Sequence, residues 1–320
     1  MNILVAGGAG FLGSNFVRHF IALGNSVVVL DNLITGEQRN ITELVGEKNF
    51  VYIQGDICDL STMNSVAQAY HFDRIYNFAC PTGVPNIAPE KLGEQMLDAC
   101  TVGVKNLLRM AQEHGAVFFH ASSAEVYGES LVTPQAEEYT GNVDVLGFRA
   151  PYEEGKRVSE TLVRLHVQKY GLDAKIVRFF NAYGPRYGMY DTRVISTLIR
   201  QALHGEPITL QGDGSQNRTF CYVTDIIEGV ELVMTKGSVG EAYNLGGVDQ
   251  LPIKEFAQQV IALTDSTSKV ICVPRPTHDH SGRLPETSKI RALGWRPRVS
   301  LSDGLRRTID DFKERIFIHA

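Results

Sequence analysis

Residues 1–31, MNILVAGGAGFLGSNFVRHFIALGNSVVVLD, decide the fold of this chain. Residues 2–6 are apolar without alternation and a glycine cluster follows them, which predicts a strand buried on both faces. Apolar residues recur at helical spacing over 11–23, and Gly24-Asn25 ends this predicted helix because both residues tolerate a left-handed cap. Residues 27–31 are a second apolar run that ends in an acid. The stretch therefore predicts a strand, a helix and a second strand.

The turn between the first strand and the helix needs glycine at three places. Gly7 permits a tight reversal, Gly10 lets backbone N–H groups approach a pyrophosphate, and Gly13 lets helix and sheet pack closely. Partial positive charge at the helix N-terminus would hold the phosphates without a lysine. Asp31 can accept hydrogen bonds from both ribose hydroxyls and would repel a 2′-phosphate, so we predict NAD rather than NADP as the cofactor.

The expected cofactor contacts lie in this turn and at the carboxyl ends of the strands that follow. Asp56 has two open interpretations, a contact with the adenine and a simple turn-forming role. The full set is Gly7, Gly10, Phe11, Leu12, Gly13, Asp31, Asn32, Asp56, Ile57 and Ala79, together with Tyr152 and Lys156.

Composition limits the classes of function that remain. The 320 residues are 43% hydrophobic and 21% charged, as in a globular protein with a sizeable core. The net charge of -5 gives no general attraction to nucleic acid or to an anionic membrane, so we expect neither as a partner. The five cysteines are widely spaced without a C-x-x-C pair, which predicts reduced thiols, mostly in the core, and no metal site.

Targeting signals are not expected. The first predicted strand begins at residue 2 and leaves no room for a signal peptide, and no apolar run approaches membrane-spanning length. We therefore expect a cytoplasmic protein.

The rest of the chain repeats the strand and helix pattern. Further strands are predicted over 50–54, 74–79, 116–120 and 175–180, with a helix capped by Asp59 and a long helical region over 90–114. Repeated units of this size predict an α/β fold, a Rossmann-type doubly wound parallel sheet.

Beyond residue 180 the predicted elements are shorter and indicate a second, smaller lobe. Strands over 219–223, 242–245 and 269–273 alternate with helices that start at Thr224, Ile253, Glu286 and Ser302. We predict an NAD-binding domain over 1–180, to which 219–246 returns. A smaller α/β substrate lobe over 181–218 and 247–320 would close over the cofactor edge.

Tyr152 and Lys156 are one helical turn apart, so their side chains point the same way. A lysine ammonium beside a phenol lowers the phenol's pKa and makes tyrosine a usable base near neutral pH. Such a pair is also common on exposed helices. Here it follows a dinucleotide turn and the pair Ser122-Ser123 at a strand end, and this context favours the chemical interpretation.

These motifs, in this order, resemble the extended short-chain dehydrogenase/reductases, the NAD-dependent epimerase/dehydratase family, over essentially the whole chain. Within that family the sequence is most similar to the UDP-glucuronic acid decarboxylases. The features that carry this likeness are Ala79-Cys80-Pro81, Gly141-x-Val143-x-x-x-Gly147-x-Arg149-x-x-Tyr152-x-Glu154-Gly155-Lys156-Arg157, Phe180-Asn181-x-Tyr183-Gly184-Pro185-Arg186 and Arg193-Val194-Ile195-Ser196.

The resemblance implies a reaction: oxidation of the sugar at C4, loss of carbon dioxide from the resulting β-keto acid, and reduction to UDP-xylose. It implies that the catalytic residues are Ser123, Glu125, Tyr152, Lys156 and Arg283. It also implies that the nucleotide sugar contacts Pro81, Arg149, Asn181, Arg186, Arg193, Arg218 and Arg283. Relatives commonly form homodimers through the helices that correspond here to 90–114 and 152–170.

Two departures from the decarboxylase pattern leave an alternative open. Ala124 stands where decarboxylases carry a hydroxyl and dehydratases an acid, and Pro151 replaces the usual cysteine and is more typical of epimerases. The alternatives are therefore a nucleotide-sugar 4-epimerase, less readily a 4,6-dehydratase, and a non-catalytic NAD-binding regulator. Glu125 could equally be a plain strand-end acid, and Arg283 a solvated loop residue.

Overall fold

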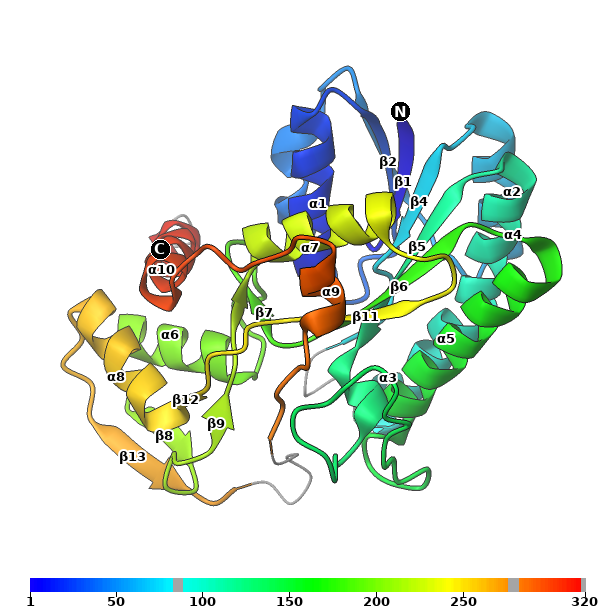
Figure 1. Cartoon of the computed structure of the whole chain (residues 1–320). Helices are drawn as coiled ribbons and strands as arrows, with labels where there is room; N and C mark the ends of the chain where they lie inside the picture. Colours follow the sequence, from blue (N-terminus) through cyan, green and yellow to red (C-terminus); the bar gives the residue numbers. More distant parts are fainter. Residues whose placement is uncertain (83–88, 276–281, 318–320) are drawn as a thin grey trace.

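A parallel sheet of seven strands forms the centre of the structure, a computed structural model that describes residues 1–82, 89–275 and 282–317 (Figure 1). The strand order is β3-β2-β1-β4-β5-β6-β11, and every pairing in it is parallel. The strands are β1 (Asn2–Ala6), β2 (Ser26–Asp31), β3 (Phe50–Gln54), β4 (Arg74–Asn77), β5 (Val117–Ser123), β6 (Ala174–Phe179) and β11 (Ala242–Leu245). The predicted doubly wound sheet is confirmed.

Helices cover both faces of this sheet. Figure 1 shows α1 (Phe11–Ala22) and α7 (Val223–Lys236) on one face and α2 (Leu60–Ala69), α4 (Val104–His114) and α5 (Ala150–Tyr170) on the other. The core is accordingly in two apolar clusters, one on each side of the strands. The long predicted helix includes α3 (Pro89–Asp98), a π-helical turn η4 (Ala99–Gly103) and α4.

Local signals place the helix ends as predicted. Gly24 has a φ of +76°, and the backbone N–H groups of Gly24 and Asn25 bond back to Ile21 and Phe20. Asp59 caps α2 by accepting from the N–H groups of Ser61 and Thr62. Short 3₁₀ turns occupy η1 (Gln38–Asn40), η2 (Thr42–Leu44) and η5 (Ala124–Tyr127).

A smaller set of elements lies beyond the carboxyl edge of the sheet. Its strand pairs are β8 (Ile208–Gln211) with β13 (Val270–Val273), β9 (Asn217–Arg218) with β12 (Leu251–Pro252), and β7 (Ala182–Tyr183) with β10 (Cys221–Tyr222). Its helices are α6 (Val194–His204), α8 (Ile253–Thr264), α9 (Ser288–Ala292) and α10 (Leu301–Phe317). Both α6 and β8 were missing from the predicted elements.

The predicted strand over 219–223 is correct only at its centre, where β10 (Cys221–Tyr222) lies. Thr219 and Phe220 belong to no strand, and α7 begins at Val223. The preceding strand, β9, ends at Arg218 and pairs with β12, whereas β10 pairs with β7. A local apolar pattern cannot reveal this division, because the partners lie far away in the sequence.

The cysteine prediction holds only in part. All five cysteines are free thiols, but only Cys100 and Cys221 are buried, so the expectation that most belong to the core is wrong. Cys58 and Cys80 are partly exposed because they line the cavity at the sheet edge, and Cys272 is exposed on β13.

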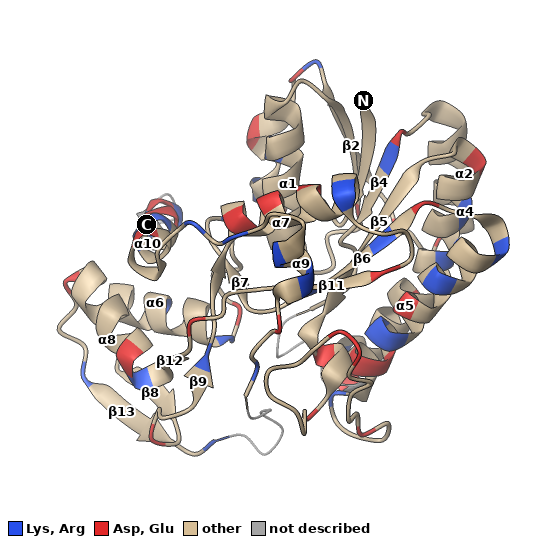
Figure 2. Cartoon of the chain, in the orientation of Figure 1, with Lys and Arg blue, Asp and Glu red and all other residues tan. Residues whose placement is uncertain are grey.

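Charged residues of both signs are mixed along the molecule. Figure 2 shows acidic and basic residues interleaved along α5, which fits the small net charge. Among the described residues no helix is long and apolar enough to cross a bilayer.

Candidate active site

The site lies where the strand order reverses, between β1 and β4, because ligands of open α/β sheets bind outside the carboxyl ends of strands at such a point. A cavity of about 910 Å³ opens there. Every residue predicted for cofactor, catalysis or substrate lines it. The structure thus gathers the whole predicted set, and the role of each residue remains a prediction.

The glycine turn after β1 has no room for side chains. A Cβ on Gly7 would lie 2.7 Å from the backbone of Phe78 and Ala79, and one on Gly13 would lie 2.1 Å from the Gly7 carbonyl oxygen. The N–H groups of Phe11, Leu12 and Gly13, in the first turn of α1, have no partner inside the helix. No acid occupies this turn. The cradle and its free donors fit the pyrophosphate of a dinucleotide.

Two acids, Asp31 and Asp56, line the part of the cavity where the sequence predicts the ribose and adenine. Asp31, 8% exposed, accepts from the N–H groups of Ala9 at 2.9 Å and Leu33 at 2.8 Å. Burial raises the pKa of this carboxyl, and the two backbone bonds lower it. Asp56 accepts from Cys58 N at 2.8 Å and from Asn32 Nδ2 at 3.0 Å, so it forms the turn and still faces the cavity.

The catalytic candidates meet on α5 and at the end of β5. Lys156 Nζ donates to the Ala121 carbonyl at 2.8 Å and lies 5.8 Å from the Tyr152 ring centroid. The Tyr152 phenol has hydrogen-bond partners in the Ser123 and Thr82 hydroxyls. Burial raises the pKa of Tyr152, while Lys156 and both hydroxyls lower it. The net direction is upward, so the expectation that the pKa of Tyr152 is lowered is wrong, because burial of the phenol outweighs the lysine.

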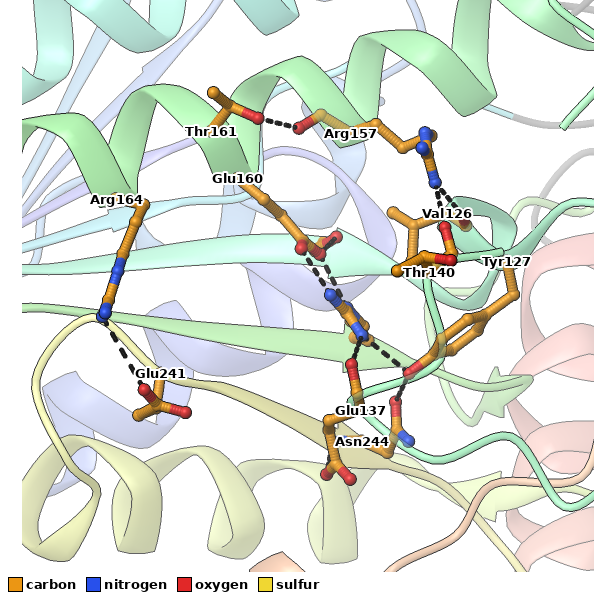
Figure 3. Close-up of polar contacts among 12 residues, drawn as sticks. Val126, Tyr127, Glu137, Thr140, Arg157, Glu160, Thr161, Arg164, Glu241 and Asn244 are labelled. Atoms are coloured by element: carbon orange, nitrogen blue, oxygen red, sulfur yellow. Dashed lines mark hydrogen bonds and ion pairs between the residues drawn. The ribbon is translucent and has the colours of Figure 1, made fainter. Parts of the chain in front are cut away.

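The two adjacent serines have different environments. Ser123 caps η5 and faces Tyr152, whereas Ser122 Oγ donates to Glu160 on α5. Glu160 in turn forms a two-pronged pair with Arg178 of β6, at 2.9 and 2.7 Å. Arg178 also donates to the Tyr127 hydroxyl and the Glu137 carbonyl, in a network drawn in Figure 3. This network fixes β5, β6 and α5 to one another behind the site.

Glu125 is held between two arginines. Its Oε2 accepts from Arg149 Nη2 and, at 3.2 Å, from Arg283 Nη2. Arg149 also reaches the buried Glu153 at 3.0 Å, and Arg283 donates to the Gly128 carbonyl at 2.6 Å. Arg283 is only 7% exposed, so the interpretation of a solvated loop residue is wrong. Its Nε is buried without a hydrogen-bond partner among the described residues.

A backbone clasp brings Arg283 to this place. Gln135 N donates to the Leu284 carbonyl at 2.8 Å, Leu284 N donates to Gln135 Oε1 at 2.9 Å, and Glu286 N donates to the Gln135 carbonyl at 2.7 Å. Gln135 is fully buried. The segment after Gly282 is therefore fastened to the loop that follows β5 by three bonds, and Arg283 is placed by its neighbours.

The predicted nucleotide residues lie on the lobe side of the cavity. Asn181 donates to the Thr219 carbonyl at 2.9 Å, Arg186 contacts Asn15 at 3.3 Å, and Arg218 lies on β9. Arg193 pairs with Asp191 and lies 4.9 Å from the Tyr187 ring. Pro81 is buried at the cavity wall. Several permanent cations therefore face one space, as an anionic ligand requires.

Sequence reasoning missed contributors to this site. Thr82 bonds Tyr152, Asn15 positions Arg186, and Cys80 lines the cavity beside Lys156. The sequence offers a signal for Thr82 and Cys80, since both follow the fourth strand at the ligand edge. Asn15 gives none, because its role depends on a residue far along the chain.

A dinucleotide cradle, a buried tyrosine and lysine pair and a cluster of cavity arginines define a nucleotide-dependent enzyme of the Rossmann class. The sequence model of the NAD dependent epimerase/dehydratase family matches residues 3–246. This chain belongs to that family and is an NAD-dependent enzyme. The expected resemblance and the expected cofactor are confirmed.

Similar sequences include decarboxylases. UDP-glucuronic acid decarboxylase 1 of Danio rerio is 38% identical over 98% of this chain and 73% of the relative. UDP-glucuronic acid decarboxylase 3 of Arabidopsis thaliana is 37% identical over 99% of this chain and 90% of the relative.

Similar structures include epimerases and dehydratases. UDP-glucose 4-epimerase of Thermotoga maritima, solved with UDP-glucose, is 27% identical with a TM-score of 0.90 and covers 99% of this chain and 100% of its own. The dTDP-glucose 4,6-dehydratase of Streptomyces venezuelae, solved with NAD, is 30% identical with a TM-score of 0.88. The match covers 99% of this chain and 98% of the dehydratase chain.

Proposed function

We propose that this enzyme decarboxylates UDP-glucuronic acid to UDP-xylose. The observation that carries the proposal is the meeting of Arg149 and Arg283 on Glu125 at the wall of the cofactor cavity. Glu125 and Glu153 balance these charges, but Arg283 keeps a buried Nε without a partner among the described residues. A sugar carboxylate would use this donor, whereas a neutral sugar has no need of it. The similarity to curated decarboxylases supports the same conclusion.

The first chemical task is to remove the proton of the sugar 4-hydroxyl. Tyr152 is the base, and Lys156 stabilises its phenolate through a charge held in place by the Ala121 carbonyl. Ser123 is bonded to the same phenol and would position the 4-oxygen. The chemistry that bound NAD would supply here is a hydride acceptor for C4 and a hydride donor for the final reduction.

The second task is loss of carbon dioxide. A ketone at C4 makes the sugar a β-keto acid, so the C5–C6 bond breaks and its electron pair becomes an enolate on the 4-oxygen. Tyr152 and Ser123 stabilise that oxygen by hydrogen bonds. Arg283 pairs with the carboxylate before it leaves, and Glu125 holds this arginine in place. A proton must then arrive at C5.

The nucleotide diphosphate needs its own cations. Arg186, Arg193 and Arg218 line the lobe side of the same cavity and are assigned to the pyrophosphate and nucleoside, together with Asn181 and Pro81, which line the cavity too. Guanidinium groups suit this task because they stay charged and bind phosphate oxygens in pairs.

A nucleotide-sugar 4-epimerase is the second candidate, and Ala124 favours it. This residue is 5% exposed and packs in a cluster with Val126, Tyr127 and Phe180, so it offers no donor group to the reaction. Pro151 is weaker evidence for an epimerase than the sequence comparison suggested. It lies in the first turn of α5, where its missing N–H is no loss.

The deciding test is incubation of the purified protein with NAD+ and UDP-glucuronic acid, followed by mass spectrometry and proton NMR. A UDP-pentose lighter by one carbon dioxide is expected. An unchanged mass with a new anomeric signal would show epimerisation instead. The Tyr152→Phe variant, which keeps the ring and loses the base, should give neither product.

Architecture and assembly extend the proposal. We assign 1–180 with 219–246 to NAD and 181–218 with 247–320 to the nucleotide sugar, which the return of β11 to the sheet supports. We also propose a homodimer through α3, η4, α4 and α5, where Leu97 of α3, Val102 of η4 and Leu165 of α5 are exposed apolar residues. Light scattering that reports a monomer at micromolar concentration would contradict it. A cytoplasmic location remains an expectation.

A further inference from the structure

Two cysteines meet at the wall of the active-site cavity. Cys80 follows β4 and lines the cavity, and Cys100 lies in the π-helical turn η4 behind it. Their sulfur atoms are 3.6 Å apart, although the residues are 20 positions apart in the sequence. A disulfide needs a separation of about 2.05 Å, so a shift of about 1.5 Å would join them.

Packing holds Cys100 in that position. A Cβ on Gly155 of α5 would lie 3.2 Å from the Cys100 sulfur, so glycine leaves the space that the thiol fills. Ser159 Oγ donates to the Cys100 carbonyl at 2.9 Å and to the Gly155 carbonyl at 2.8 Å. The π-helical turn is thus fixed against α5 one turn from Lys156, at a kind of irregularity frequent at functional sites.

The surroundings favour ionisation of the pair. The hydrogen bond between the sulfurs lowers the pKa of Cys100 and raises that of Cys80, so the pair first loses a single proton as one unit. Lys156 stabilises negative charge on either sulfur. The negative charge therefore rests on Cys100, and Cys80, the sulfur that faces the cavity, keeps its proton and donates it to Cys100.

We propose that Cys80 and Cys100 form a reversible disulfide that inactivates the enzyme when a hydroperoxide enters the cavity. Cys80 passes its proton to the Cys100 thiolate as its sulfur attacks the peroxide, the O–O bond breaks, and the Cys80 sulfur becomes a sulfenic acid while an alcohol or water leaves. Cys100 then attacks this sulfur, the S–O bond breaks, and water leaves. Two thiols and one hydroperoxide thus give one disulfide, one alcohol or water and one further water.

The consequence for the site follows from the neighbours of Cys80. Ala79 N donates to Asn77 Oδ1 at 3.0 Å, Pro81 is buried, and Thr82 forms a hydrogen bond with Tyr152. Residues 79–82 therefore connect the end of β4, where the cofactor is expected, to the proposed catalytic base Tyr152. Drawing Cys80 toward η4 displaces these residues. The disulfide also removes the negative charge that the pair can place beside Lys156.

The test treats the purified full chain with hydrogen peroxide and then measures thiols, peptide linkage and NAD+ affinity. Three of the five thiols should survive, one cross-link should join the peptides that hold Cys80 and Cys100, and NAD+ affinity should fall and recover with dithiothreitol. These readouts do not depend on which sugar the enzyme accepts, so they stay informative if the proposed function fails.

Variants of two cysteines make the result decisive. Cys100→Ser should show no cross-link and no dithiothreitol-reversible loss of affinity, and Cys100→Ala replaces it if the serine variant does not fold. Cys272→Ser, which changes the exposed thiol on β13, should behave as the wild type. Absence of the cross-link, an unchanged affinity despite the cross-link, an equal reversible loss in both Cys100 variants, or protection by Cys272→Ser would each overturn the proposal.

Discussion

Arg283 Nη2 lies 3.2 Å from Glu125 Oε2, although 158 positions separate the two residues. Both side chains line the cofactor cavity, and Arg149 holds the same carboxylate oxygen. The relationship joins a strand-end acid of the parallel sheet to a segment close to the end of the chain. It gives the site a cation that is buried and positioned before any substrate binds.

Replacing Arg283 should therefore damage recognition of an acidic sugar specifically. For Arg283→Ala we expect kcat/KM with UDP-glucuronic acid to fall by about 10²-fold or more, because an electrostatic group at the reacting carboxylate is lost. The affinity for UDP-xylose, which lacks the carboxylate, should change much less. Arg298→Ala removes an arginine whose side chain is 72% exposed and should change neither quantity. Equal losses of affinity for both nucleotide sugars would contradict the assigned role.

Lys156 should govern the pH dependence of the reaction. Burial raises the pKa of Tyr152 and Lys156 lowers it, and the base must be deprotonated, so activity falls as pH drops through that pKa. In Lys156→Met the counter-charge is gone, the pKa rises further, and the acid limb of the pH profile should move to higher pH by about one unit or more.

A matched control for this shift exists on the same helix. Lys169 lies 4.9 Å from the Tyr170 ring but is solvent-facing, so Lys169→Met should leave the pH profile unchanged. A Lys156→Met enzyme that is less active at every pH, with the acid limb in place, would show that lysine acts through cofactor contacts alone.

The Arg178 network should carry a large share of local stability. In Arg178→Ala the Glu160 carboxylate, whose side chain is 14% exposed, loses its two-pronged partner, and we expect a loss of about 3 kcal/mol in the free energy of unfolding. Arg164 pairs with Glu241 at 3.7 Å with both side chains nearly half exposed (Figure 3). Its replacement by alanine should cost about 0.5 kcal/mol or less. Urea unfolding of both variants measures the two losses in the free energy of unfolding. Similar losses in both variants would refute the special role of the Arg178 network.

Gly13 should be indispensable to cofactor binding. A Cβ there would lie 2.1 Å from the Gly7 carbonyl oxygen, so Gly13→Ala must distort the turn. We expect NAD+ affinity to fall by about tenfold or more. Gly24→Ala adds a methyl to open space at a φ of +76°, so it should lower stability by about 1 kcal/mol without changing the Kd for NAD+. Calorimetric titration with NAD+ separates the two effects. Unchanged NAD+ binding by Gly13→Ala would refute the proposal that this glycine turn holds the cofactor.

The sequence revealed what depends on near neighbours. Gly7, Gly10 and Gly13 were recognisable because their requirement arises within one turn, and Tyr152 with Lys156 because a helix puts them on one face. The doubly wound parallel sheet followed from repeated strand and helix units. All these features need only short stretches of chain for their interpretation.

Features that join distant segments were harder to predict. Spacing alone could not show that Glu125 pairs with Arg283, that β9 and β10 have different partners, or that Cys80 meets Cys100. The net direction of the Tyr152 pKa was also hidden, because it depends on how deeply the fold buries the phenol. Burial and tertiary contact are properties of the assembled fold.

The backbone clasp between Gln135 and the segment after Gly282 has a consequence for the order in which the parts of the site are synthesised on the ribosome. Lys156, the last predicted cofactor residue, leaves the ribosome 127 positions before Arg283. The edge of β6 also has no neighbour until residues 242–245 of β11 emerge. Because synthesis runs from the N-terminus, the nascent chain carries its dinucleotide cradle long before it can recognise an acidic sugar. Substrate selection is the last property of the site to be made.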